Sequence, residues 1–371
     1  MRIVFWQNIL SPHWSATIRA LAERTREVVL VAAEGMSADR KTQGWDIPNF
    51  GRRQIVLSPT RADIRDIVHN GDGGSVHLIG GMRWTAMGDA VIRQCLRASA
   101  RFGIISEAAN DAGWKGLLRR VRYGGERIRA GRRFDFILAM GQLGVCWFRR
   151  CGYDAQRVFP YAYVTESAAT PSDDRSASGA YRILFLGQVV PRKGLDILCR
   201  SLGQLQETNW TLTVVGDGPQ RSQLQALAKQ LRIASRIQWQ GTLANRAAIG
   251  QIEQSDLLVL PSRFDGWGAV VNEARLRGVP VICSDRCGAA DLLAEPWRGG
   301  VFRSGDAADL SRLLTPWIRQ GYRTEPFASR IRDWSRGIEG PAVAQYLLEI
   351  LDHVYHGGPR PAPPWQQRRA A

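Results

Sequence analysis

The sequence lacks long apolar runs, paired cysteine motifs and, apart from four positions, lysine. No stretch approaches the ~20 consecutive apolar residues of a membrane-spanning helix, and the N-terminal residues lack the apolar core of a secretion signal. The six cysteines are scattered without a Cys-x-x-Cys pair, which favours free, mostly buried thiols over a metal site. We therefore expect a cytoplasmic protein without a metal centre.

Length and composition are those of a soluble globular protein. The 371 residues suffice for two separate cores, and the contents of 44% hydrophobic and 23% charged residues are ordinary. The net charge of +16 is unusual, and residues 1–165 carry most of it, with 25 Lys and Arg residues against 14 Asp and Glu residues. A pI near 10.3 is also typical of nucleic-acid-binding proteins. No interleaved aromatic and basic signature accompanies it, so we expect no nucleic-acid partner.

The densest basic segment, residues 114–133, has an amphipathic pattern. Trp114, Leu117, Leu118 and Val121 recur at helical spacing between arginines. This pattern predicts an interfacial helix, whose apolar stripe enters the head-group region of a membrane while its cations meet anionic lipid. The alternative is a helix whose stripe packs on the protein's own sheet.

Both halves of the chain alternate strand-like apolar runs with helical patterns, which predicts α/β domains with parallel sheets. Two successive Rossmann-like domains imply a cleft that encloses a ligand. The predicted organisation is a first domain over 1–165, a linker over 166–180, a second domain over 181–340, a helix over 341–356 and a proline-rich, flexible or surface-bound tail over 357–371.

Two acids flank a glycine turn in the second half of the chain. Asp265 and Glu273 stand eight positions apart, the turn Gly266 to Gly268 follows the first acid, and an apolar strand pattern precedes it. Glycine lets a phosphate approach the backbone, and amides at a helix N-terminus carry partial positive charge. We therefore predict a phosphate site, with Asp265 near the group attached to the phosphate and Glu273 near the hydroxyls of a ribose. The candidate amide donors are those of Gly268, Ala269 and Val270.

These acids resemble the acid-x7-acid signature of retaining glycosyltransferases of family 4, which have the two-domain GT-B fold. Further matching segments follow in order through the second half of the chain. They are residues 181–187, Pro191 to Gly194, Val215 to Pro219, Gln240 to Thr242, and Gly278 to Gly288. The resemblance implies two Rossmann-like domains facing each other across a cleft, with the last helix crossing back to the first domain.

The resemblance also implies roles for single residues. Lys193 is expected to meet the diphosphate of a nucleotide-sugar donor, close to Gly187 at the end of the preceding strand. Gly216 is expected near the nucleotide, and Thr242 near its base.

Two positions depart from the family pattern. The family has Glu where this chain has Asp265, which keeps the charge but shortens its reach. It has Arg where this chain has Gln188, which donates a hydrogen bond without a charge. The second cation at the diphosphate is then expected from Arg192 or Arg263.

The first domain is expected to supply the acceptor side. His13 follows the first predicted strand and Glu107 follows a later one, and such positions lie at the rim of a parallel sheet where ligands bind. The family has paired glycines in the loop that here contains His13, so no phosphate role is expected for this loop.

These features predict a retaining glycosyltransferase that moves a sugar from a nucleotide-diphosphate donor to a hydroxyl of a lipid-linked saccharide, in cell-surface polysaccharide or glycolipid synthesis. The resemblance implies catalysis without a metal or other cofactor, because cations and helix amides stabilise the departing diphosphate. We expect the enzyme on the inner face of the cytoplasmic membrane. Two alternatives are a sugar-nucleotide 2-epimerase of similar architecture and a non-catalytic GT-B-like subunit.

Overall fold

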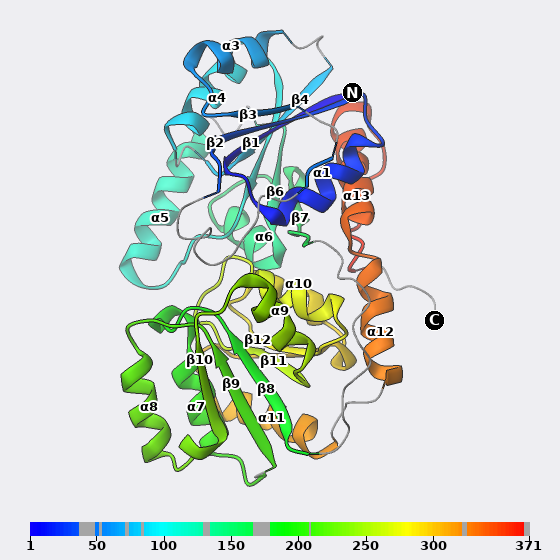
Figure 1. Ribbon diagram of the computed structural model, residues 1–371. Coiled ribbons are helices and arrows are strands. Elements are labelled where there is room, and N and C mark those ends of the chain that lie inside the picture. Colours follow the sequence, from blue (N-terminus) through cyan, green and yellow to red (C-terminus); the bar gives the residue numbers. More distant parts are fainter. Residues whose placement is uncertain are drawn as a thin grey trace. The chain divides into compact units, whose positions relative to one another are not determined.

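The computed structural model describes most of the chain as two compact units (Figure 1). It describes residues 1–371 except 37–48, 52–53, 71–73, 83–84, 129–133, 166–178, 208, 321–324 and 367–371. Unit 1 comprises the described residues of 1–166 and 338–371, and unit 2 those of 167–337. Most of the predicted linker over 166–180 therefore lies outside the described residues.

Unit 1 is built on a parallel sheet of seven strands in the order β3-β2-β1-β4-β5-β6-β7. The strands are β1 (Arg2–Ile9), β2 (Glu27–Glu34), β3 (Gln54–Leu57), β4 (Ser75–Gly80), β5 (Arg101–Ser106), β6 (Phe136–Met140) and β7 (Val158–Tyr161). The central strands are apolar and buried along most of their length. Such continuous burial is the property of a parallel sheet that is covered on both faces.

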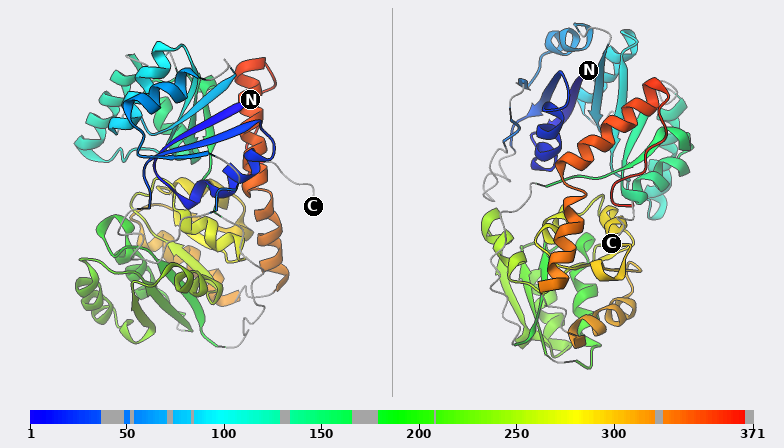
Figure 2. Two further views of the ribbon diagram at one scale, coloured as in Figure 1. Left: turned by 45° about the horizontal axis from the view of Figure 1, so that its top comes forward. Right: turned by 90° about the vertical axis from the view of Figure 1, so that its right-hand side faces the viewer.

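Helices pack around this sheet (Figure 2). They are α1 (Ser15–Ala22), α3 (Arg61–His69), α4 (Ala86–Arg97), α5 (Gly113–Glu126), α6 (Gly141–Arg150) and α13 (Gly340–His356). The last of these comes from the far end of the chain and lies against α1. The Tyr346 hydroxyl of α13 donates a hydrogen bond to Pro160 O at 3.0 Å, next to the end of the sheet. The final helix is thus part of unit 1.

Residues 357–366, in the proline-rich tail, also lie against unit 1. The Trp365 side chain is buried, and its ring packs edge-on against Tyr346. The Arg360 guanidinium donates to the carbonyl oxygens of Gln156 and Val158 at 2.6 and 2.8 Å. These ten residues lie on the surface of unit 1, where one buried indole and one multiply bonded guanidinium anchor them.

Unit 2 is a parallel sheet of six strands in the order β10-β9-β8-β11-β12-β13. The strands are β8 (Tyr181–Leu186), β9 (Trp210–Val215), β10 (Ile237–Gly241), β11 (Leu257–Leu260), β12 (Val281–Ser284) and β13 (Gly299–Phe302). The helices are α7 (Leu195–Gly203), α8 (Arg221–Gln230), α9 (Asn245–Glu253), α10 (Ala269–Leu276), α11 (Ala307–Gln320) and α12 (Glu325–Arg336). Both units are doubly wound Rossmann-like domains, which confirms the predicted fold class. No helix in the described part of either unit is both long and apolar enough to cross a membrane.

The first prediction concerns the close packing of strand ends in unit 2. Gly216, after β9, has a left-handed φ of 128°, and a Cβ atom there would lie 2.0 Å from Gly187 O. We expect Gly216→Ala to lower the free energy of unfolding by about 2–3 kcal/mol through steric overlap and backbone strain. Gly250→Ala is the matched control, because this glycine lies inside α9 with open space around it. The control should be neutral or stabilising by about 0.4–1 kcal/mol in urea denaturation, and equal midpoints for the two variants would contradict the prediction.

Candidate functional site

The carboxyl ends of β8 and β11 form the switch point of the unit 2 sheet. β8 pairs with β9 on one side and with β11 on the other, so the connections leaving β8 and β11 run in opposite directions along the sheet. Open parallel sheets bind ligands outside the strands at such a point. The loops over 187–194 and 261–268, which carry most of the predicted donor-side residues, both begin there.

A lysine and a carboxylate from these two loops form an ion pair. The Lys193 ammonium lies 2.6 Å from Asp265 Oδ2, and the two side chains are only 15% and 12% exposed. The loops can approach because Gly194 has no Cβ, which would lie 2.0 Å from Pro261 O. An ammonium group has three N–H donors, so Lys193 retains donors for an anionic ligand while it is paired.

The two neighbouring arginines have different partners. Arg263 makes two hydrogen bonds to the Asp196 carboxylate, at 2.6 and 2.7 Å. Arg192 donates to Phe264 O at 3.2 Å, and its guanidinium lies 3.9 Å from Asp265. Of the two candidates for a second cation, Arg192 therefore lies beside the carboxylate, whereas Arg263 is held by Asp196.

The turn Gly266 to Gly268 packs closely beneath the start of α10. Gly268 has a left-handed φ of 92°, and a Cβ there would lie 2.7 Å from Cys287 Sγ. Ala269 and Val270 form the first turn of α10 and are partly exposed. Amides in a first helical turn have no acceptor within their own helix, so this end of α10 can bind an anion beside the ion pair.

Glu273 lies on α10, one turn beyond these amides, and is half-buried. Burial raises the pKa of its carboxyl group, and the charge of Arg277 opposes this shift. Within the described part of the chain, the Glu273 carboxylate forms no hydrogen bond or ion pair with another residue. A carboxylate in such surroundings can accept hydrogen bonds from ligand hydroxyls.

The remaining donor-side residues lie at the carboxyl ends of β8, β9 and β10. Gly187 follows β8, and the exposed Gln188 is next to it. The Gly216 N–H donates to Gly241 O at 2.7 Å, which joins the ends of β9 and β10, and the exposed Thr242 follows. The structure therefore brings these residues to the same edge of the sheet as Lys193.

In unit 1 the structure places His13 and Glu107 at the carboxyl edge of the sheet, together with a tyrosine. The Tyr163 hydroxyl is hydrogen-bonded to Glu107, and burial together with this carboxylate raises the pKa of Tyr163 well above its usual value. The rings of His13 and Tyr163 have centroids 5.8 Å apart, and Val164 N donates to His13 O at 3.2 Å. The sequence does not predict Tyr163 as a residue of this site, because the short strand β7 before it contains a proline and gives a weak strand pattern.

A chain with two doubly wound domains of this kind has the GT-B fold. Residues 169–334 match the model of the family described as Glycosyl transferases group 1. The family model thus matches nearly the whole of unit 2, in agreement with the resemblance drawn from the sequence motifs.

Curated relatives agree with this family. The chain is 33% identical over 153 residues to a lipopolysaccharide 1,6-galactosyltransferase of Escherichia coli, covering 40% of this chain and 41% of that protein. It is 26% identical over 258 residues to a GDP-mannose-dependent alpha-(1-6)-phosphatidylinositol monomannoside mannosyltransferase of Mycolicibacterium smegmatis, covering 64% of this chain and 66% of that protein. The matches thus span from about two fifths to just under two thirds of these relatives.

Solved structures share the fold of both units. HepE from Anabaena in complex with UDP has a TM-score of 0.72 at 17% identity, over 95% of this chain and 100% of that one. The lipopolysaccharide outer core galactosyltransferase WaaB has a TM-score of 0.68 at 16% identity, over 96% and 99% of the two chains. At these identities the likeness concerns the fold alone.

The second prediction uses the raised pKa of Glu273. The folded protein binds the carboxyl proton of Glu273 more tightly than the unfolded chain does. The contribution of Glu273 to the free energy of unfolding therefore falls as pH rises above the ordinary glutamate pKa of ~4.3. We expect Glu273→Gln to raise the thermal unfolding midpoint at pH 7.5, and the gain to vanish below pH ~4. Glu23→Gln, at an exposed glutamate of unit 1, is the control and should show no such gain. A midpoint for Glu273→Gln equal to wild type at pH 7.5 would refute the argument.

Proposed function

We propose that this chain is a retaining glycosyltransferase of the family 4 type, which transfers a hexose-type sugar from a nucleotide-diphosphate donor to a hydroxyl of a lipid-linked saccharide. One observation carries the proposal: the Lys193–Asp265 pair lies in two loops at the switch point of unit 2, beside the N-terminus of α10, the helix that carries Glu273. The family of unit 2 and the UDP complex of HepE support a nucleotide-sugar donor.

In this proposal the donor diphosphate binds between Lys193 and the first-turn amides of α10. Gly187 and Gly216 lie in close contact at the strand ends beside this position, and Glu273 accepts hydrogen bonds from the ribose hydroxyls. Thr242 lies toward the base, and Gln188 donates to a phosphate oxygen. Asp265 holds the Lys193 ammonium in place and faces the sugar.

The chemical step breaks the bond between the anomeric carbon and the diphosphate oxygen. Negative charge grows on the leaving diphosphate, so Lys193, Arg192 and the α10 amides bind the transition state more tightly than the ground state. The acceptor hydroxyl attacks from the same face and passes its proton to the departing phosphate oxygen, which gives retention. No metal or other cofactor is required for this charge stabilisation.

The acceptor is assigned to unit 1. His13, Glu107 and Tyr163 form a polar cluster, joined by the Tyr163–Glu107 hydrogen bond and the His13–Tyr163 ring contact, which suits the hydroxyls of a saccharide. The curated relatives named above act, by their names, on lipopolysaccharide and on a phosphatidylinositol mannoside, which supports a saccharide attached to a lipid.

The third prediction tests the role of Lys193. We expect Lys193→Ala to lower turnover of the nucleotide-sugar about 100- to 1,000-fold, because it removes a donor to the charge that develops on the diphosphate. Affinity for the free nucleoside should stay within about twofold, since a nucleoside has no phosphate. Lys229→Ala, at an exposed lysine of α8, is the matched control and should leave both quantities unchanged.

The assay also separates the alternatives. Wild-type protein is incubated with UDP-, GDP- and ADP-sugars, with and without EDTA, and products are identified by NMR. Release of nucleoside diphosphate that is insensitive to EDTA supports the proposal, whereas an epimerised nucleotide-sugar indicates a 2-epimerase. A folded protein that binds none of these donors indicates a non-catalytic subunit. Equal losses of nucleoside and nucleotide-sugar affinity in Lys193→Ala would make this lysine structural.

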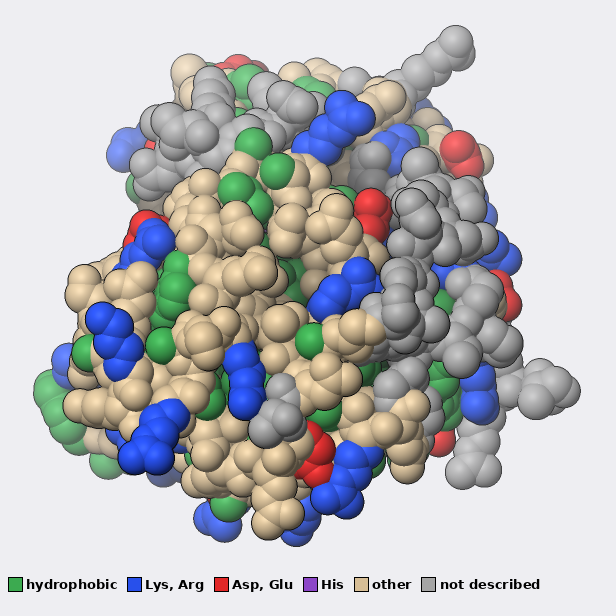
Figure 3. All heavy atoms as spheres, turned by 60° about the horizontal axis from the view of Figure 1, so that its bottom comes forward, with side chains coloured by type: hydrophobic (Ala, Val, Ile, Leu, Met, Phe, Trp, Pro, Cys, Tyr) green, Lys and Arg blue, Asp and Glu red, His purple; other side chains and the backbone are tan. Residues whose placement is uncertain are grey.

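We further propose that α5 attaches the enzyme to an anionic membrane surface. The apolar stripe of Trp114, Leu117, Leu118 and Val121 is 53–68% exposed, so the alternative in which it packs on the sheet of unit 1 does not hold. Arginines flank the stripe on α5, which gives the helix the charge that anionic lipid attracts. The face of the protein in Figure 3, by contrast, shows lysines and arginines scattered among other side chains.

The fourth prediction concerns this stripe. We expect the double variant Leu117→Ser and Leu118→Ser to bind anionic liposomes at least tenfold more weakly than wild type in a flotation assay, even at low salt, because each lost apolar contact contributes about 1–2 kcal/mol. Its thermal unfolding midpoint should be unchanged, since both side chains are exposed. Leu57→Ser, at a half-exposed leucine of β3, is the control and should bind normally. Wild-type protein that does not float with anionic liposomes would rule out the attachment.

A further inference from the structure

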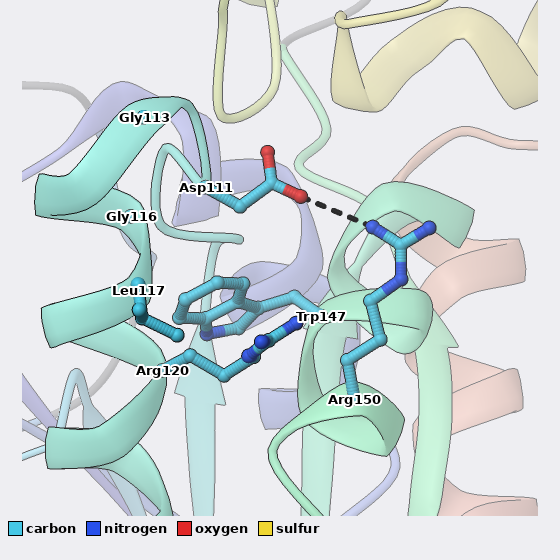
Figure 4. Close-up of a pocket in the computed structure, with 7 residues that line it drawn as sticks. All are labelled: Asp111, Gly113, Gly116, Leu117, Arg120, Trp147 and Arg150. Atoms are coloured by element: carbon cyan, nitrogen blue, oxygen red, sulfur yellow. Dashed lines mark hydrogen bonds and ion pairs between the residues drawn. The ribbon is translucent and has the colours of Figure 1, made fainter.

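A polar pocket lies between α5 and α6 of unit 1 (Figure 4). It has a volume of about 210 Å³, and its walls include Asp111, Gly116, Leu117, Arg120, Trp147 and Arg150. The buried indole of Trp147 forms one wall. None of these residues belongs to the donor or acceptor residues assigned above, so the pocket needs a separate explanation.

Two arginines from different helices enter this pocket. In Figure 4 the Arg120 side chain extends from α5 toward α6 beside Trp147, and Arg150 extends from the end of α6 toward Asp111. The Arg150 guanidinium is held 3.0 Å from the Asp111 carboxylate. The Arg120 guanidinium forms no hydrogen bond or ion pair with any residue that the structure describes. Arg120 therefore offers its planar set of N–H donors to a ligand.

The loop at Asp111 is packed directly on α5. A Cβ at Gly116 would lie 2.1 Å from the backbone carbonyl of Asp111, so only glycine permits this contact. The contact fixes the carboxylate beside the first turn of the helix, and the carboxylate in turn orients Arg150. The pocket is thus formed by packed backbone and an ion pair as well as by the exposed Arg120.

The charges that line the pocket determine which anion fits. Arg120 and Arg150 contribute two positive charges and Asp111 one negative charge, so the net charge is about +1. A phosphomonoester carries about −1.5 to −2 at neutral pH, so part of its negative charge would be left uncompensated beside the Asp111 carboxylate. A phosphodiester carries a single negative charge and matches the pocket.

The pocket also adjoins the exposed apolar stripe of α5. Leu117 lines the pocket and is at the same time part of the stripe. A stripe at the boundary between acyl chains and head groups would bring the pocket to the depth of the lipid phosphates. We propose that this pocket binds the phosphodiester of an anionic phospholipid head group, an inference that rests on the proposed membrane attachment of α5.

The fifth prediction compares two arginines of one helix. Arg120→Gln and Arg122→Gln remove the same charge from α5, but only Arg120 lines the pocket. Vesicles of the phosphate-free lipid digalactosyldiacylglycerol receive their negative charge either from phosphatidylglycerol or from oleate, at matched surface potential. We expect Arg120→Gln to weaken binding to the phosphatidylglycerol vesicles tenfold or more, and Arg122→Gln about fivefold. On oleate vesicles both losses should be about fivefold.

The outcomes separate the pocket from the proposals on which it rests. Equal losses for the two variants on both kinds of vesicle would overturn the pocket while leaving membrane attachment intact, and failure of wild type to bind any vesicle would overturn both. Asp111→Asn should shift the preference toward phosphatidic acid, whose head group is a phosphomonoester. Binding of soluble dimethyl phosphate is measured by calorimetry. If this binding depends on Arg120 but vesicle binding does not, the pocket binds a free anion, and the proposal of a lipid head group is overturned. Nucleotide-sugar turnover in detergent should be unchanged in all three variants, because none of the residues belongs to the proposed transfer site.

Discussion

The close approach of strand ends in unit 2 is the constraint on which the candidate site depends. At Gly194 and Gly216 a Cβ atom would come within 2.0 Å of a carbonyl oxygen of a neighbouring loop. These contacts bring the loops after β8, β9 and β11 together, and they place the Lys193 ammonium 2.6 Å from the Asp265 carboxylate. A methyl group at Gly194 would overlap Pro261 O and push apart the two loops that carry Lys193 and Asp265.

The same region keeps charges that do not favour folding. Glu273 is held on α10 with its pKa raised by burial, so its ionised form costs stability at neutral pH. Lys193 and Asp265 are largely withdrawn from water and depend on each other for compensation. Such charges persist in a fold when a ligand uses them, because binding then supplies the partners that the protein does not.

The first six strands of unit 1 have the same order as the six strands of unit 2, and β7 is an additional strand at the edge, but unit 1 carries different chemistry. Its strand ends hold the cluster of His13, Glu107 and Tyr163. It also carries most of the excess positive charge and the exposed stripe of α5. Two domains with one topology thus differ in the loops and helices that follow their strands, which is where function is placed on this fold.

The sequence by itself determined the two α/β domains, the glycine turns at the strand ends of unit 2 and the position of Lys193 beside them, because these depend on local patterns: continuous apolar runs, glycines at strand ends, and one acid before a helix with a second acid within it. It did not reveal the short strands β3, β7 and β13, whose few residues give weak patterns. Only the tertiary structure decided that Asp196 holds Arg263, that Tyr163 joins Glu107, and that Trp365 anchors the last described residues. These contacts join segments far apart in the chain, which no local pattern reports. The amphipathic stripe of α5 is the same whether it faces a core or a membrane, so its exposure could be learned only from the packing around it.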